Sequence, residues 1–271
     1  MAGRVQSPSS INIYKQCPRK YFYLYIKKLP TKPSIHLVRG TIVHETLEYF
    51  FQRPVPPLGS DLKTNLLHHT LSIAKERWVE HAEELSMLGM TVAELTSYRE
   101  ETTMMLINWV NHFYAIIEGE MQTGLSYDAA FTRHTPRIEE EYLNHELQVR
   151  GYIDAIHERD GEVHIRDYKT SKKPVISDEY RLQLAIYALL YKKTHGVVPD
   201  TVGIFFLKYG EQIMSVNDEL LKEADLEIRW VHERTQSTDM NDYQKRFSPL
   251  CNYCDFYDSC WNQKALDEFG K

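Results

Sequence analysis

The hydrophobic period of the chain changes near residue 137, and this change limits the fold more than any other feature of the sequence. Before residue 137 apolar residues recur at helical spacing, whereas after it short stretches alternate as strands do. Helices, then a strand meander, a helix and a further strand predict an α/β fold with a mixed sheet core, flanking helices and a helical insertion. The expected helices cover about 8–16, 18–29, 37–52, 61–86, 91–119, 179–195 and 218–236, and the expected strands 137–144, 147–158, 162–171, 201–210 and 211–216.

We expect one domain over residues 1–271, because a chain of 271 residues can bury a sizeable core. The turn-rich stretch RPVPPLGS separates the N-terminal helices (1–52) from a helical insertion (53–136). The strand meander and its helix form a core over 137–217. A last helix and a cysteine-rich segment complete the chain over 218–271.

Charge and composition exclude a global basic field. The net charge is -6 and the pI is about 6.1, so any contact with nucleic acid must come from a local patch. No apolar run reaches the length of a membrane span, and the N-terminal MAGRVQSPSS lacks the apolar core of a signal peptide. We therefore expect a cytoplasmic protein in a reducing compartment.

Two acids and a lysine lie on the expected central hairpin. Asp154 lies in GYIDAI, and Asp167 and Lys169 lie in RDYKTS, with an Asp-Gly turn at 159–161 between the two strands. Pairing through this turn brings Asp154 close to Asp167. Since Asp167 and Lys169 are two apart in a strand, they point to the same face. That face presents two carboxylates and one ammonium group.

This set suits metal-assisted hydrolysis. A hard cation such as Mg²⁺ takes oxygen ligands and keeps several waters, so Asp154 and Asp167 suffice to hold it, with the carbonyl of Tyr168 as a further candidate ligand. The metal activates a water and polarises a phosphodiester, while Lys169 orients the water or stabilises charge on the phosphate. The alternative is an ordinary surface hairpin with paired charges. Apolar neighbours, such as Ile153 and Ala155, favour a less solvated position.

The four cysteines are divided between the two ends of the chain. Cys17 lies near the N-terminus, and Cys251, Cys254 and Cys260 lie within ten residues near the C-terminus. In a reducing compartment, clustered cysteines bind metal more often than they form disulfides.

These motifs together resemble the PD-(D/E)XK nuclease superfamily. The residues that carry the resemblance are G-x-x-x-H-x-x-x-E at Gly40, His44 and Glu48, G-x-I-D at Gly151, Ile153 and Asp154, D-Y-K-T from Asp167 to Thr170, and Q-x-x-x-Y at Gln183 and Tyr187. With one cysteine before the core and C-x2-C-x5-C after it, the chain is more narrowly similar to the RecB-like iron–sulfur branch. That branch includes CRISPR-associated Cas-four-type nucleases, the nuclease domain of AddB and exonuclease V. The resemblance covers about 7–50 and 137–262, and the insertion matches none of the family's motifs.

The resemblance implies a restriction-endonuclease-like core and further site residues. It makes His44 a third metal ligand, which favours Mn²⁺ slightly over Mg²⁺; the alternative is an ordinary packed histidine. Gln183 and Tyr187 share one helix face, where they contact the scissile strand or orient Lys169. The alternative for this pair is interior packing.

The resemblance also implies that four thiolates hold a [4Fe–4S] cluster. Cys17 would then be joined to Cys251, Cys254 and Cys260 across the core, so the cluster would pin the two ends of the chain together. A four-cysteine Zn²⁺ site is the alternative, although zinc sites usually pair C-x2-C with C-x2-C.

A basic and aromatic run, PRKYFYLYIKK, suggests contact with single-stranded DNA, since bases stack on rings and cations follow phosphates. The candidate contacts are Arg19 and Lys20 in this run and Lys172 and Arg181 near the hairpin. The alternative places the aromatics of the run in the core.

From these features we expect a Mg²⁺- or Mn²⁺-dependent deoxyribonuclease. The resemblance implies an exonuclease that acts on single-stranded DNA or frayed ends, 5′ to 3′, in CRISPR spacer acquisition or DNA repair. A second hypothesis is a DNA-end-binding subunit of a complex with an integrase or helicase, with minor nuclease activity. A third is a zinc-stabilised nuclease that acts on RNA, because nothing in the sequence reads the 2′-hydroxyl.

Overall fold

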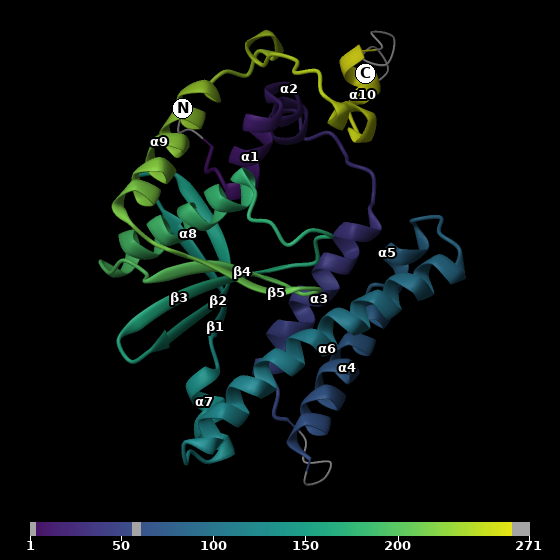
Figure 1. Ribbon diagram of the computed structural model, residues 1–271. Coiled ribbons are helices and arrows are strands. Elements are labelled where there is room, and N and C mark those ends of the chain that lie inside the picture. Colours follow the sequence, from purple (N-terminus) through teal and green to yellow (C-terminus); the bar gives the residue numbers. More distant parts are fainter. Residues whose placement is uncertain (1–3, 56–60, 262–271) are drawn as a thin grey trace.

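A five-stranded mixed sheet with its strands in chain order forms the centre of the computed structural model, which describes residues 4–55 and 61–261 (Figure 1). The strands are β1 Arg137–Asn144, β2 Val149–Arg159, β3 Glu162–Lys169, β4 Thr201–Phe206 and β5 Gly210–Ser215. Strands β3 and β4 pair in parallel, and the other neighbours pair antiparallel. The mixed sheet with flanking helices confirms the predicted α/β fold class.

The parallel pair needs a crossover, which helix α8 Asp178–His195 supplies. Ser177 caps its first turn, and Gly196 ends it at a φ of 73°, in the left-handed region that favours glycine. The helix lies very close to β2, because a Cβ atom at Gly151 would be 2.9 Å from the ring of Tyr187. Glycine in the GYID motif therefore has a packing role.

The helical insertion packs against helix α3, which precedes it, and against the sheet through Ala155, Tyr168 and Phe205 (Figure 1). These helices are α3 Ile35–Gln52, α4 Leu62–Glu80, α5 Ala82–Ser86, α6 Val92–Gln122 and α7 Tyr127–His134. Phe50, Trp109 and Phe113 form an aromatic cluster that also takes in Tyr168 and Phe205 from the sheet. The insertion thus shares a hydrophobic core with the strands.

The N-terminal helices pack against the C-terminal part of the chain. These elements are α1 Pro8–Gln16, α2 Pro18–Tyr21 and the π-helix Phe22–Ile26, with α9 Asp218–Arg234, the 3₁₀ turns Met240–Asp242 and Pro249–Tyr253, and α10 Tyr257–Trp261. Buried rings of Tyr14, Tyr21 and Tyr243 contact one another where the two segments meet. Both segments lie at the end of the molecule opposite α7 (Figure 1).

Strand β2 reverses its two faces at Asp154. Ile153 packs in the hydrophobic cluster of α8, whereas Ala155 packs in the cluster of α6, although residues two apart in a regular strand share a face. The ladder between β1 and β2 also skips one rung here, since it joins Ile138 to Ala155 and Glu140 to Ile153 but not the two residues between them. Asp154 therefore lies at an irregularity of the sheet.

Most of the predicted elements are found within a few residues of their expected bounds. The expected helix 61–86 is instead divided at His81 into α4 and α5, and α7 was not predicted. The rings of Tyr21, Phe22 and Tyr23 are buried in the core. This agrees with the alternative for the run PRKYFYLYIKK, which placed its aromatic side chains in the core. No helix in the described part of the chain is long and apolar enough to cross a membrane.

Candidate active site

Three acidic side chains from three adjacent strands come to one level of the sheet. Glu139 of β1 lies at the rung opposite Asp154 of β2, between the pairs Ile138–Ala155 and Glu140–Ile153. The ladder between β2 and β3 ends at Ala155 and Arg166, so its next position sets Asp154 opposite Asp167. The predicted proximity of the two aspartates across the hairpin matches this register.

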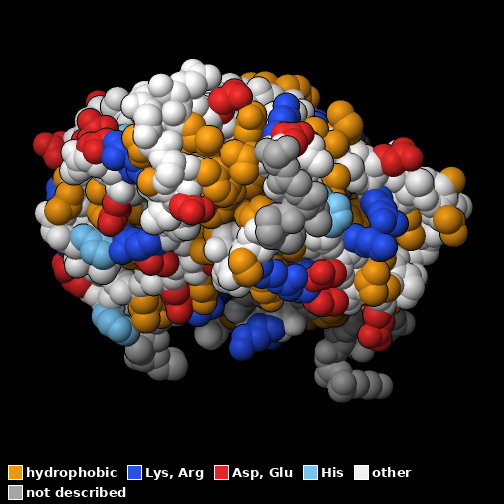
Figure 2. All heavy atoms as spheres, turned by 90° about the horizontal axis from the view of Figure 1, so that it is seen from below, with side chains coloured by type: hydrophobic (Ala, Val, Ile, Leu, Met, Phe, Trp, Pro, Cys, Tyr) orange, Lys and Arg blue, Asp and Glu red, His pale blue; other side chains and the backbone are white. Residues whose placement is uncertain are grey.

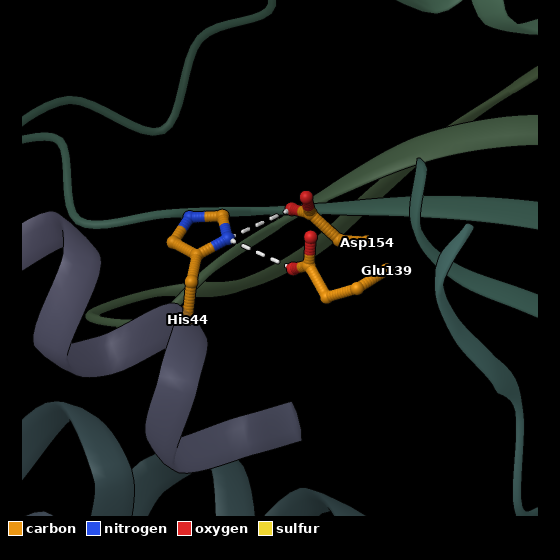
Figure 3. Close-up of side chains that lie close together, drawn as sticks. All are labelled: His44, Glu139 and Asp154. Carbon is orange, nitrogen blue, oxygen red and sulfur yellow. Dashed lines mark ion pairs between the residues drawn. The ribbon is translucent and has the colours of Figure 1, made fainter. Parts of the chain in front are cut away.

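His44 of helix α3 reaches this row of acids from outside the sheet. Its Nδ1 lies 3.4 Å from Oδ2 of Asp154 and 3.7 Å from Oε1 of Glu139 (Figure 3). Ligand atoms of His44, Glu139 and Asp154 all lie within 4.8 Å of one another. One imidazole and two carboxylates at this spacing can hold a divalent metal ion.

The charges of this group are tightly linked. Burial opposes protonation of His44, but the Asp154 carboxylate and the hydrogen bond to Glu139 outweigh it and raise the pKa of His44 to about 10. Burial would raise the pKa of Asp154, but charged His44 lowers it. The imidazolium thus neutralises the acids in the metal-free protein, and a metal ion would have to displace its proton.

Glu139 was not among the predicted site residues. Its backbone adopts a φ of 49°, which is uncommon for a residue other than glycine and is a feature of functional sites. A run of three glutamates in RIEEEYLN, on the strand before the hairpin, was the available signal. Choosing among the three requires the register with Asp154, which the sequence does not contain.

Asp167 is almost fully buried and held from two sides. Its Oδ1 accepts a hydrogen bond of 2.8 Å from Gln183, and its Oδ2 lies 2.6 Å from Nζ of Lys169. The same amide of Gln183 donates to the hydroxyl of Tyr187 at 2.7 Å. Of the predicted pair on α8, Gln183 therefore contacts Asp167, and Tyr187 contacts Gln183. Among the described residues, neither forms a hydrogen bond with Lys169.

Burial raises the pKa of Asp167 to about 6, with Asp154 adding to the effect and Lys169 opposing it. Burial would lower the pKa of Lys169, but Asp167 and Asp154 raise it, so Lys169 stays charged. Oδ2 of Asp167 is buried, and its contact with the described residues is the ion pair with Lys169. A buried carboxylate oxygen of this kind, one position from the metal-ligand group, fits a site for a cation.

Tyr168 connects the site with the core. Its backbone N–H donates to Oδ2 of Asp154 at 2.7 Å, and its ring packs against Trp109 of the insertion. The predicted use of its carbonyl as a metal ligand stays a prediction. Glu48, one turn beyond His44, accepts a hydrogen bond from Gln52.

All four cysteines line one cavity at the far end of the molecule. Cys17 lies between α1 and α2, and the other three lie in or beside the 3₁₀ turn Pro249–Tyr253 and α10. Burial and the neighbouring thiols of Cys17 and Cys254 raise the pKa of Cys260 to about 11. In the described ranges no three sulfur atoms lie within the 4.8 Å spacing that a single ion would require.

The predicted DNA contacts have different surroundings. Arg19 is buried and donates from Nε to the carbonyl of Tyr243, which contradicts a direct contact with DNA, because its guanidinium is used inside the protein. Lys20 lines the cysteine cavity, Arg181 forms an ion pair of 2.5 Å with Glu223, and Lys172 is exposed. Basic and acidic side chains are interspersed on the face shown in Figure 2.

Comparisons with known proteins give one family, two relatives and one similar fold. A family model described as the PD-(D/E)XK nuclease superfamily matches residues 6–261. The Gene 69 protein of Mycobacterium phage D29 is 29% identical, over 94% of this chain and 96% of its own, and the Gene 69 protein of Mycobacterium phage L5 is 24% identical over the same shares. Among solved structures, a "Putative exonuclease" from Eubacterium rectale has a similar fold, with a TM-score of 0.52 and 14% identity, over 93% of this chain and 87% of its own.

Proposed function

The chain belongs to the PD-(D/E)XK nuclease superfamily, and from that premise we propose that it is a nuclease that hydrolyses phosphodiester bonds of DNA with the help of Mg²⁺ or Mn²⁺. One observation carries the proposal: the ligand atoms of His44, Glu139 and Asp154 lie within 4.8 Å of one another, beside Asp167 and Lys169. A folding role alone does not explain why a charged imidazole, three acids and a buried lysine meet at an irregular point of the sheet.

His44, Glu139, Asp154 and Asp167 are the residues that would hold the metal ion. A bound divalent metal lowers the pKa of a water ligand and neutralises charge on the phosphate. The three acids offer oxygen ligands, which Mg²⁺ and Mn²⁺ prefer, and the nitrogen of His44 shifts the preference slightly towards Mn²⁺. For His44 to act as a ligand, it must first lose the proton that Asp154 and Glu139 stabilise.

The chain's own residues would orient the reaction. Lys169 keeps its charge next to Asp167 and is well situated to stabilise the phosphate as negative charge develops. Gln183 holds Asp167 in one rotamer through its amide, and Tyr187 occupies the second hydrogen of that amide. The backbone N–H of Tyr168 holds Asp154 in the same way. Such pre-organised side chains avoid a cost of reorganisation during the reaction.

Exonuclease action on single-stranded DNA or frayed ends, 5′ to 3′, belongs to the proposal through the resemblance of the motifs to the RecB-like branch. A role in CRISPR spacer acquisition or DNA repair rests on the same resemblance. Lys172 and Lys20 are the candidate contacts with the DNA backbone that remain accessible.

A [4Fe–4S] cluster on Cys17, Cys251, Cys254 and Cys260 is part of the proposal. One observation supports it: the four thiols line one cavity, although they come from the two ends of the chain. When bound, the cluster would join the N-terminal helices to the C-terminal segment. Zinc is the alternative that metal analysis would distinguish.

A second candidate function is a DNA-end-binding subunit that docks on an integrase or helicase. The helical insertion and the start of α3 expose large apolar side chains, namely Leu37, Val79, Met87, Val92 and Met104. Exposed apolar side chains, where they form a contiguous patch, are a feature of partner surfaces. In this case the insertion would bind the partner, and nuclease activity would be minor.

A nuclease assay on end-labelled single-stranded DNA tests the proposal. The full chain is incubated with Mg²⁺, with Mn²⁺ and with chelator, and wild type is compared with Lys169→Ala and with Lys75→Ala, an exposed lysine of α4. Metal-dependent degradation that is lost in Lys169→Ala and kept in Lys75→Ala supports the nuclease. If all three proteins bind DNA and none cuts it, the end-binding alternative is the better description.

A further inference from the structure

A second cavity, of about 100 Å³, lies on the opposite face of β3 from the candidate active site. Asp167 and Lys169 point towards α8, whereas Arg166 and Tyr168, which alternate with them, line this cavity. Helices α6 and α7 close it from the side of the insertion. None of the metal-ligand group lines it, so the cavity is distinct from the active site.

One wall of the cavity is apolar and the other is rich in nitrogen. The apolar wall consists mainly of aromatic rings, among them Trp109, Phe113 and Phe205. The polar side chains that line the cavity, its polar wall, are His112, His134, His157, Arg159, His164, Arg166 and Glu211. Six of these seven side chains carry nitrogen atoms that can donate hydrogen bonds.

The polar wall carries two guanidinium groups, of Arg159 and Arg166, and one carboxylate, of Glu211. Arg166 donates from Nε to Glu211, so this cation and the single carboxylate of the lining neutralise one another. Arg159 forms no ion pair with a carboxylate within residues 4–55 and 61–261. Its Nη1 donates to Nδ1 of His134 at 2.6 Å, while Nε2 of His134 donates to Glu120 at 2.8 Å.

Arg159 also has a buried donor without an acceptor, since its Nε makes no hydrogen bond. Arg159 as a whole is half-buried, but a buried Nε without an acceptor is costly, because desolvation of this donor is not repaid by a hydrogen bond. The position of this group at a cavity is therefore best explained by an anion that completes the pairing.

His157 supplies a further donor at the cavity wall. It makes no hydrogen bond to the described part of the chain. Burial lowers the pKa of His157 to about 3, with the charges of Arg166 and Arg159 adding to the effect. At neutral pH the imidazole is therefore uncharged and offers one N–H to the cavity.

The size of the cavity limits the ligand. On the measure by which about 10–15 Å³ holds one water, a cavity of about 100 Å³ has room for several waters. This space suits a tetrahedral oxyanion, whereas pockets for larger ligands occupy about 300 Å³ or more. We propose that the cavity binds a small inorganic oxyanion of the size and charge of phosphate, held by Arg159 and His157.

Titration of the full chain with inorganic phosphate tests this proposal by calorimetry, in the presence of chelator and at constant ionic strength set with chloride. We expect saturable binding of one phosphate in wild type. Affinity should fall roughly tenfold or more in Arg159→Gln, as for the loss of a charged hydrogen bond. Arg150→Gln, an exposed arginine on the same strand, should bind phosphate as wild type does.

Two further variants distinguish loss of the phosphate site from loss of folding and from effects at the active site. If Arg159→Gln does not fold by circular dichroism, His157→Leu removes a donor at similar volume and should also weaken binding. Asp154→Asn should leave phosphate binding intact, which separates this cavity from the active site and makes the result independent of nuclease activity. Absence of saturable binding in wild type, or equal affinity in Arg159→Gln and Arg150→Gln, would overturn the proposal.

Discussion

Nδ1 of His44 lies 3.4 Å from Oδ2 of Asp154, so a helix near the N-terminus and a central strand meet through one ionic contact. The two residues are far apart in the sequence and belong to different layers of the fold. The contact has consequences for stability as well as for metal binding.

The first prediction concerns the pH dependence of stability without metal. The pKa of His44 rises from 6.5 in the unfolded chain to about 10 in the folded protein, chiefly through Asp154 acting against burial. Because the folded pKa is raised, the contribution of the charged contact is complete below about pH 6.5 and is lost as pH rises towards 10. Urea unfolding in chelator should therefore show a difference between wild type and His44→Gln that shrinks from pH 6.5 to pH 9.5. A constant difference would contradict this assignment.

The second prediction concerns Glu139 as a metal ligand. Glu139→Gln keeps the shape of the side chain but removes its charge, so binding of Mn²⁺ should weaken by about tenfold or more. The measurement is the rise in melting temperature with Mn²⁺ concentration. Glu141→Gln, two residues further along β1 and exposed, is the matched control. Equal Mn²⁺ responses in both variants would remove Glu139 from the site.

The third prediction concerns the glycine of the GYID motif. A Cβ at Gly151 would lie 2.9 Å from the buried Tyr187 ring, so Gly151→Ala should lower the free energy of unfolding by about 1–3 kcal/mol. Gly119→Ala in α6, where no atom lies within 4 Å of the new Cβ, should be neutral or stabilising by up to about 1 kcal/mol. Chemical denaturation measures both. A Gly151→Ala protein as stable as wild type would show that α8 does not depend on this close approach.

The fourth prediction concerns the four-cysteine cavity. Protein prepared without oxygen should be brown and contain iron, and Cys254→Ser should lose both the colour and the iron. Limited proteolysis should then cut the C-terminal segment faster, because its link to Cys17 is lost. Ser259→Ala, in the same segment, should keep the iron. Colourless wild-type protein with stoichiometric zinc would exclude the cluster.

Local patterns predicted most of the elements correctly. The Asp-Gly turn predicted the hairpin of β2 and β3, and Ser7 with Pro8 predicted the start of α1. The break at His81 was missed, since no proline or glycine marks it. Helix α7 was missed because its eight residues show too few turns of a helical pattern.

The residues of the candidate active site were predicted unevenly. The motifs identified His44, Asp154, Asp167 and Lys169, and the structure brings these residues together. Glu139 was missed, because one glutamate among three becomes a site residue only through strand register. Arg19 was predicted as a candidate DNA contact although it is buried, because the sequence of a basic and aromatic run does not show which of its side chains face solvent.

The sequence by itself determined the class of fold, the hairpin and the residue types of the candidate site, since turn chemistry and hydrophobic period act over a few neighbouring residues. Only the tertiary structure decided that β2 reverses its faces at Asp154, that Glu139 stands opposite it, and that Arg159, with a buried Nε that has no acceptor, lines a cavity behind the site. These features depend on register and on how distant helices pack on the sheet. Both are set by burial of the whole core, which no local stretch of sequence contains.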